Sequence, residues 1–172
     1  ATTDPLTGML NRTGLEDAAR LLARDERRRS HGVAVLYIDL DGLGVVNREH
    51  GHPAGDTVLR AVADRLAGAV RSGDVVARVG GDEFVVLAAG VDDEGAGTLA
   101  VKLADAVTRP LSLEHGRRVV PSISVGVTVG TSDEDTADLV ARADQAMLAR
   151  KAVLYAGTDR YERYDRNDER HD

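Results

Sequence analysis

The fold of this chain is decided by residues 75–88, which read VVARVGGDEFVVLA. Two apolar runs rich in β-branched residues flank a glycine pair, a pattern that is typical of a β-hairpin. Glycine reaches positive φ at little cost and lets a ligand approach the backbone, so we expect Gly80 and Gly81 to form the turn. Two adjacent carboxylates, Asp82 and Glu83, follow directly. The hairpin alone allows either a solvated acidic turn or a site that binds a cation.

A second pair of carboxylates follows the most apolar run of the chain. Residues 33–38, VAVLYI, predict a central strand buried on both faces, and the run stops at Asp39-Leu40-Asp41. If the strand continues, its period of two places Asp39 and Asp41 on the same side. Carboxylates at the end of a buried strand are costly unless a cation pairs with them. Together with the hairpin carboxylates they favour a metal site.

Helical periodicity alternates with these strands along the rest of the chain. A capping-box pattern at residues 13–16 predicts the start of a first helix, which the basic run 27–29 ends. A polar, glycine-bearing loop over residues 47–56 is expected to lead into a second helix. The other predicted elements are a helix around residues 99–107, a hairpin of residues 111–113 and 119–129, a last helix ending at Arg150-Lys151, and a short strand near residues 161–164.

This order of elements predicts the fold class. A sheet that contains antiparallel strands, with helices packed on one side, fits the order and gives an α/β chain of the α+β sandwich type. One domain is expected over residues 1–165. Residues 166–172 are nearly all charged, so we expect them to form a disordered tail.

Composition excludes several classes of protein. The 172 residues include 22 Lys and Arg against 29 Asp and Glu, which gives a formal net charge of −7. This acidity argues against nucleic acid as a partner but is compatible with a nucleotide held through metal ions. Cysteine is absent, so thiol chemistry is excluded. No apolar run approaches the ~20 residues that span a bilayer, so we expect no membrane contact from this segment and a cytoplasmic location.

The motifs together resemble those of the GGDEF family of diguanylate cyclases. The resemblance covers roughly Asp4 to Asp165, and the motifs fall in the family's order and spacing. It implies a ferredoxin-like α/β sandwich similar to the adenylyl cyclase palm, which agrees with the order of elements above. It rests on Asp4-x-Leu6-Thr7-Gly8-x-x-Asn11-Arg12, Asp39-x-Asp41, Asn47, Gly51-His52, Gly55-Asp56, residues 80–84, Ala143-Asp144 and Lys151.

The resemblance implies a cyclase that condenses two GTP molecules into cyclic di-GMP and releases pyrophosphate. Attack of a 3′-hydroxyl on an α-phosphate calls for Mg²⁺ or Mn²⁺, which take carboxylate and carbonyl oxygens. By resemblance Asp39, the carbonyl of Leu40 and Asp82 bind the metal. Asp82 and Glu83 are the candidates for deprotonating the hydroxyl, and the sequence does not separate base from ligand. Because one domain offers one nucleotide site, catalysis is expected to need a homodimer.

The resemblance also implies which residues hold the nucleotide. Asn47 and Asp56 match the pair that reads guanine, since a carboxylate accepts from two guanine N–H groups that adenine lacks. From spacing alone, Asp56 is equally compatible with a helix N-terminus. The other expected nucleotide contacts are His52, the backbone amides of Gly80 and Gly81, and Lys151 at the γ-phosphate.

Two positions depart from the family pattern. Leu43-Gly44 stands where the family usually has Phe-Lys, and after Lys151 the usual phosphate-binding arginine is Tyr155 or Thr158, with Arg160 as a candidate substitute. Each lost charge-assisted contact to phosphate weakens the binding free energy of GTP by roughly 1.5–3 kcal/mol. The rival hypothesis is therefore a regulatory module that binds GTP or cyclic di-GMP without turnover. A ferredoxin-like interaction domain with no ligand is a third reading, but it leaves the aligned carboxylates unexplained.

Arg71-Ser72-Gly73-Asp74 precedes the hairpin and resembles the family's inhibitory site for cyclic di-GMP, an Arg-x-x-Asp at this distance. An arginine fork holds a phosphate or a guanine edge, and a carboxylate accepts from guanine donors. The alternative is an arginine at a helix end and an aspartate in a turn. Since no second arginine is evident near Lys102-Leu103, we expect weaker binding than at a complete site.

Overall fold

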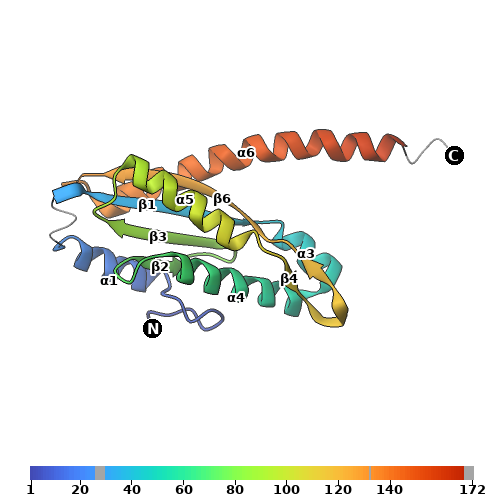
Figure 1. The fold of residues 1–172 in the computed structure, drawn as a ribbon, viewed down its shortest axis with the longest axis horizontal. Helices are drawn as coiled ribbons and strands as arrows, with labels where there is room; N and C mark the ends of the chain where they lie inside the picture. Colours follow the sequence, from blue (N-terminus) through green and yellow to red (C-terminus); the bar gives the residue numbers. More distant parts are fainter. Residues whose placement is uncertain (26–29, 132, 169–172) are drawn as a thin grey trace.

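The computed structural model describes residues 1–25, 30–131 and 133–168 (Figure 1). Its elements follow the predicted alternation of helices and strands, with one additional helix. They are α1 (Arg12–Leu22), β1 (Val33–Asp41), α3 (Leu43–His50), α4 (His52–Ala69), β2 (Val75–Arg78), β3 (Glu83–Ala89), α5 (Asp93–Val107), β4 (Leu111–Ser112), the 3₁₀ turn η1 (Glu114–Gly116), β5 (Arg118–Val119), β6 (Ser122–Gly130) and α6 (Thr136–Asp168).

Four strands form an antiparallel sheet in the order β2-β3-β1-β6. The predicted hairpin is confirmed as β2 and β3, which pair from Val75↔Leu87 to Arg78↔Phe84. The predicted central strand is also confirmed, since β1 is buried at every residue before Asp41. The pairing of β1 with β3 sets Asp39 directly opposite Glu83. The sheet therefore brings together the two carboxylate-bearing segments singled out in the sequence.

Helices cover both faces of the sheet, so the expectation that they pack on one side is wrong. Alternate residues of β1 point into two separate cores, one covered mainly by α4 and α5 and the other by α1 and α6. In β1, Leu36 and Ile38 belong to the first core, whereas Val35 and Tyr37 belong to the second. A strand between two helical layers must be apolar at successive positions, which is why residues 33–38 form a continuous apolar run.

The first helix begins earlier than the capping-box pattern predicts. Asn11 is the N-cap of α1, and its side-chain oxygen accepts a 3.0 Å hydrogen bond from the Gly14 N–H. Thr13 lies inside the first turn, so the pattern at residues 13–16 does not cap the helix. Leu15 and Leu22 bury the predicted face against the sheet. The basic run 27–29 lies outside the described residues.

Residues 47–56 do not form the loop that the sequence suggested. The segment contains the end of α3, a reversal at Gly51 with φ of 87°, and the start of α4. This positive φ suits glycine, and the Gly51 N–H donates back to the Asn47 carbonyl at 2.9 Å. Asn47 and Asp56 consequently lie on two neighbouring helices, which hold them more rigidly than a loop would.

The C-terminal third differs from the prediction in two places. The predicted second hairpin is reduced to β4 and β5, and after Pro121 the chain enters β6, which pairs with β1 in the main sheet. Helix α6 does not end at residues 150–151 but continues through residues 161–168, where a strand and the start of a tail were expected. Helix α6 extends past the sheet (Figure 1). Residues 169–172 lie outside the described part.

Among the described residues, no helix is both long enough and apolar enough to cross a bilayer.

Candidate metal and nucleotide site

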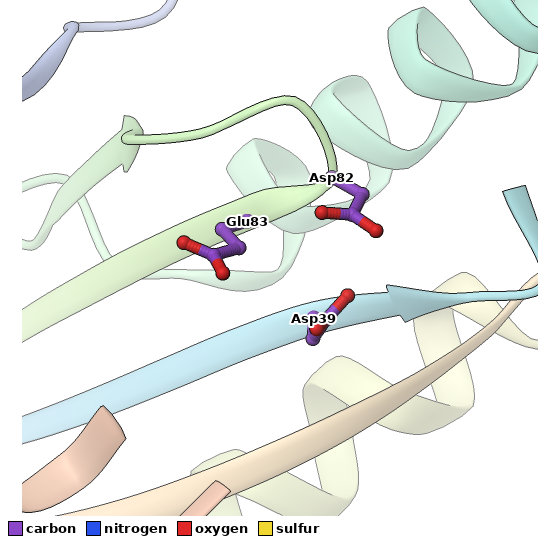
Figure 2. A group of neighbouring side chains, drawn as sticks. All are labelled: Asp39, Asp82 and Glu83. Atoms are coloured by element: carbon purple, nitrogen blue, oxygen red, sulfur yellow. The ribbon is translucent and has the colours of Figure 1, made fainter. Parts of the chain in front are cut away.

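Three carboxylates meet where β1 ends and β3 begins. Asp39 on β1 faces Asp82 and Glu83 at the start of β3 (Figure 2). Each side chain offers one oxygen, and these oxygens lie within 4.8 Å of one another. The Leu40 N–H donates to the Asp82 carbonyl at 2.8 Å, which holds the turn against β1. The sheet thus brings together three carboxylates that the sequence analysis named as candidate metal-binding or catalytic residues.

Asp41, the fourth carboxylate, does not join this cluster. Its two oxygens accept hydrogen bonds from Ser122 Oγ at 3.2 Å and Ser124 Oγ at 2.9 Å, both on the neighbouring strand β6. Among the described residues, the candidate metal group consists of the other three carboxylates alone. The sequence could not separate Asp39 from Asp41, because both project from the same side of β1 and only the partner strands differ.

The surroundings of Asp39 fit a divalent cation. The residue is 5% exposed, and its Oδ2 accepts a 2.6 Å hydrogen bond from Lys151 Nζ. Its Oδ1 is buried and has no hydrogen-bond partner in the described structure. Burial raises the pKa of Asp39 to about 6; the Lys151 hydrogen bond opposes this shift, and the charge of Asp82 adds to it. An orphaned carboxylate oxygen beside two further carboxylates matches the hard oxygen ligands of Mg²⁺ and Mn²⁺.

Glu83 is held by a tyrosine that the sequence analysis treated only as part of an apolar strand. Tyr37 Oη donates a 2.7 Å hydrogen bond to Glu83 Oε2. Burial, and then this bond to Glu83, raise the pKa of Tyr37 above its ordinary value, so the hydroxyl keeps its proton at neutral pH. The sequence did contain a signal for this contact, because Tyr37 lies two residues before Asp39 and therefore on the same face of the strand.

The two glycines of the turn matter because they lack side chains. The expected positive φ is wrong for both Gly80 and Gly81, since neither is among the positive-φ residues. A Cβ at Gly80 would lie 3.0 Å from Glu83 Oε2, so this glycine leaves room for the carboxylate. A Cβ at Gly81 would meet nothing within 4 Å. The backbone at Gly81 is thus open to an approaching ligand, whereas Gly80 accommodates the protein's own glutamate.

Arg78 anchors the hairpin turn to the N-terminal segment. Its Nε and Nη2 donate to the Gly81 carbonyl at 3.2 and 2.7 Å, and its Nη1 donates to both oxygens of Asp4 at 3.1 Å. Asp4 also accepts from the Thr7 N–H at 2.9 Å and from Thr7 Oγ1 at 2.7 Å. The opening motif of the chain therefore supports the turn. Sequence reasoning missed Arg78, although an arginine in an otherwise apolar strand beside the glycine pair was a usable signal.

The expected guanine-reading residues come from α3 and α4. Asn47 Oδ1 is buried without a hydrogen-bond partner in the described structure, and a Cβ at Gly55 would overlap the Asn47 amide. Asp56 is half-buried one turn into α4, whose N-cap is Gly51, so the alternative role as helix cap is wrong. His52 is exposed at the first position of α4. The Asn47 oxygen therefore packs against Gly55 of α4, where the lack of a side chain makes room for it.

The departures from the phosphate-binding pattern have structural counterparts. Gly44 lies in the first turn of α3, and Arg48 Nη1 lies 3.4 Å from where a Gly44 Cβ would be. Sequence reasoning missed this exposed arginine, which the spacing of four residues in a helix places over Gly44. Lys151, expected at a phosphate, contacts Asp39 instead. The side chains of Tyr155, Thr158 and Arg160 lie outside the described part of the structure.

Arg71 and Asp74 lie together, as the Arg-x-x-Asp pattern requires. Asp74 accepts from the Arg71 N–H at 3.0 Å, from Nε at 3.3 Å and from Nη2 at 3.1 Å, and Nη2 also donates to the Ala89 carbonyl. The Asp74 side chain is 2% exposed and that of Arg71 is 53% exposed. No hydrogen bond is recorded for Arg71 Nη1 within the described residues. On α5, Lys102 is exposed and Leu103 is buried.

The family model described as "Diguanylate cyclase, GGDEF domain" matches residues 1–153. The chain belongs to the GGDEF domain family. Diguanylate cyclase TpbB of Pseudomonas aeruginosa is 38% identical over 153 residues, which are 86% of this chain and 34% of TpbB. A solved structure of TpbB comprising only the GGDEF domain has a TM-score of 0.80 at 36% identity, covering 87% of this chain and 88% of that one. These matches confirm the predicted family and fold.

The relatives do not share one activity. Cyclic di-GMP phosphodiesterase NbdA of Pseudomonas aeruginosa is 37% identical over 150 residues, which are 87% of this chain but 19% of NbdA. The GGDEF domain of DgcB from Caulobacter crescentus, solved in complex with c-di-GMP, has a TM-score of 0.81 at 25% identity and covers 88% of each chain. The chain thus spans 19% of the length of NbdA and 34% of that of TpbB.

Proposed function

We propose that this domain is a diguanylate cyclase that joins two GTP molecules into cyclic di-GMP, releases pyrophosphate and depends on Mg²⁺ or Mn²⁺. The observation that carries the proposal is the cluster of Asp39, Asp82 and Glu83, with Oδ1 of Asp39 buried and unpaired in the described structure. Carboxylates gathered without enough counter-charge are costly in a structural site and useful in one that binds a divalent cation. The similarity to TpbB, named a diguanylate cyclase, supports the same reading.

In this reaction Asp39, the Leu40 carbonyl and Asp82 would hold the cation, which would polarise the phosphate and offset its developing charge. The 3′-hydroxyl oxygen of each GTP forms a bond to the α-phosphorus of the other, and each α-phosphorus loses its bond to pyrophosphate, so that two phosphodiester bonds form and two pyrophosphates leave. The hydroxyl proton passes to a carboxylate, for which Asp82 and Glu83 are the candidates. The exposed backbone of Gly81 and its neighbour Gly80 would contact phosphate oxygens.

Selection of guanine is assigned to the two helices beside the cluster. Asp56 would accept from guanine N1–H and the exocyclic amine, and the buried Asn47 amide would complete the contact, with His52 nearby at the start of α4. Adenine would leave the Asp56 acceptor unpaired. Gly44 removes the family's usual lysine, so the candidate phosphate contacts would be the exposed Arg48 and Lys151, which contacts Asp39 in this structure. Two such domains, facing each other with twofold symmetry, would supply the two nucleotides of one product.

The test is to incubate the protein with GTP and Mg²⁺ and to identify the products by mass analysis. We expect the mass of cyclic di-GMP together with pyrophosphate, and no product in the presence of a chelator. Asp39→Asn, Asp82→Asn and Glu83→Gln should abolish the product in proteins that remain folded by circular dichroism. Full activity in Asp82→Asn would contradict the assignment of the cluster.

The rival function is a module that binds GTP or cyclic di-GMP for regulation and has lost turnover. Two observations favour it: glycine at position 44, and the contact of Lys151 with Asp39 in place of a free approach to phosphate. The similarity to NbdA, named a phosphodiesterase, shows that relatives of this chain occur in proteins with another activity. Nucleotide binding in calorimetry without product in the mass analysis would decide for the rival.

We also propose that Arg71 and Asp74 bind cyclic di-GMP as an inhibitory site. The Nη1 group of Arg71 points two N–H donors away from its bonds to Asp74, and a domain named in complex with c-di-GMP has the same fold as this chain. Because Lys102 and Leu103 stand where a second arginine would complete such a site, we expect weaker binding than at a complete site. Calorimetry with cyclic di-GMP on the parent protein and on Arg71→Ala tests this proposal.

A further inference from the structure

Tyr37 is a buried polar side chain that stands outside the three-carboxylate cluster but touches it. Its ring belongs to the core between the sheet and helices α1 and α6, and the residue is 4% exposed. Its hydroxyl donates the 2.7 Å hydrogen bond to Glu83 Oε2. A buried tyrosine hydroxyl needs a partner, and this one bonds to a carboxylate of the candidate metal site rather than to the backbone.

The register of the sheet explains how the two side chains meet. Tyr37 lies opposite Val85, and Asp39 lies opposite Glu83, across β1 and β3. Tyr37 and Glu83 are therefore diagonal neighbours, at a separation that an aromatic side chain can span. Because side chains alternate along a strand, Tyr37 and Asp39 project from the same face of β1. One face of one strand thus provides both a member of the cluster and the hydroxyl that contacts another member.

Glu83 has two carboxylates close beside it, while Arg12 is the nearby cation that acts on both Tyr37 and Asp144. Asp39 and Asp82 each offer an oxygen within 4.8 Å of the Glu83 oxygen. The negative charge of Glu83 also acts on Asp144 of α6, whose pKa is raised by burial and then by that charge. Repulsion from these groups favours rotation of the Glu83 side chain toward solvent. The Tyr37 hydroxyl opposes this rotation, and Gly80 leaves the space in which the carboxylate rests.

We propose that Tyr37 is a positioning residue of the metal site, whose hydroxyl orients Glu83 so that its carboxylate is presented to a divalent cation together with Asp39 and Asp82. The inference rests on the proposed metal-dependent function, adds Glu83 to the oxygens that would hold the cation, and adds Tyr37 as a residue that acts through Glu83. Groups that orient metal ligands from outside the ligand set are typically worth 10–100-fold in metal affinity or activity. If Tyr37 only fills the core, its ring is what matters, and loss of the hydroxyl leaves the metal site unchanged.

The test compares Tyr37→Phe, which keeps the ring, with the parent protein and with Thr57→Val as a matched control. Thr57 also donates a hydroxyl hydrogen bond, 3.0 Å to the Pro53 carbonyl, but does so at an exposed position on α4. Mn²⁺ binding is followed by electron paramagnetic resonance without nucleotide, and cyclic di-GMP formation gives kcat and KM. We expect Tyr37→Phe to bind Mn²⁺ about 10-fold more weakly and to lower kcat with little change in KM for GTP. Thr57→Val should match the parent.

A double variant separates positioning from other effects. Adding Tyr37→Phe to Glu83→Gln should not weaken Mn²⁺ binding further, since the hydroxyl acts through that carboxylate. An unchanged Mn²⁺ affinity in Tyr37→Phe, or equal losses with and without the Glu83 substitution, overturns the inference. So does a Tyr37→Phe protein that fails to fold, because the hydroxyl would then serve the core.

The two proposals can fail separately. A parent protein that binds Mn²⁺ but forms no cyclic di-GMP contradicts the cyclase function, while the Mn²⁺ comparison still decides the role of Tyr37. A parent protein that binds no Mn²⁺ overturns the metal site and the role of Tyr37 together.

Discussion

Replacing Asp39 by asparagine should stabilise the metal-free protein and remove its response to magnesium. Burial raises the pKa of the Asp39 carboxyl from 3.8 to about 6, against the opposing hydrogen bond from Lys151. The folded state therefore binds this proton more tightly than the unfolded state does. The resulting contribution to stability is fully present below pH 3.8 and is lost as the pH rises through about 6. At 1.36 kcal/mol per pKa unit, the ionised carboxylate costs about 3 kcal/mol at neutral pH.

Asparagine has the shape of the protonated carboxyl group and does not ionise. In urea unfolding without metal at pH 8, we expect the free energy of unfolding of Asp39→Asn to exceed that of the parent by up to about 3 kcal/mol. The difference should shrink toward zero at about pH 4, where the parent carboxyl is protonated in the folded state. Magnesium at a hundredfold excess over its Kd should stabilise the parent by about 2.7 kcal/mol and leave the variant unchanged.

Asp41→Asn is the matched control for this experiment. Asp41 is two residues away on the same strand, is half-buried, and already accepts hydrogen bonds from Ser122 and Ser124. Its replacement should give no gain in stability at pH 8 and should preserve the response to magnesium. The reasoning is refuted if Asp39→Asn is less stable than the parent at pH 8, or if it is stabilised by magnesium as strongly as the parent.

Three further predictions follow from the other contacts of the site. Asp56→Ser should reduce the preference for GTP over ATP by roughly 1–3 kcal/mol, the cost of an unpaired buried acceptor, and competition titration measures it. A parent protein without GTP preference would contradict that role. Arg78→Ala should lower the free energy of unfolding by roughly 3–5 kcal/mol, because it breaks the largely buried ion pair with Asp4. Urea unfolding that shows no loss of stability would contradict the role of Arg78 as an anchor of the turn. Arg71→Ala should abolish inhibition by cyclic di-GMP while cyclase activity persists, and equal calorimetric affinity in parent and variant argues against the site.

The three-carboxylate cluster could be predicted from the sequence because each half follows a short-range rule. A glycine pair between two β-branched runs predicts a hairpin, and carboxylates after a buried strand predict a site that needs counter-charge. Both rules concern residues close in the sequence. They identified Asp39, Asp82 and Glu83 before the pairing of β1 with β3 placed them together. Asp41 was grouped with Asp39 because both follow the buried run, but β3 places Glu83 opposite Asp39 and pairs with no residue at position 41, where Asp41 bonds to serines of β6.

The contacts that support the cluster could not be predicted in the same way. Tyr37 meets Glu83 across 46 positions of sequence, and Arg78 meets Asp4 across 74. Each contact depends on the register between strands or on where the N-terminal turn docks, and neither quantity is encoded in local periodicity. The helix α3 was missed for a different reason: its polar residues and flanking glycines are typical of a loop, and tertiary packing overrides that preference.

The same unfavourable charge links the sequence argument, the stability prediction and the proposed function. A structural role for Asp39 would be served by a partner for each oxygen, yet Lys151 satisfies Oδ2 while Oδ1 stays buried and unpaired in the described structure. Tyr37 then holds a second carboxylate beside the first instead of letting it turn away. Under the proposed function, a divalent cation would offset the charge of both carboxylates when it binds. If Asp39→Asn raises stability and Tyr37→Phe weakens Mn²⁺ binding, the two results have one cause, which is that this end of the sheet holds negative charge in place for a cation.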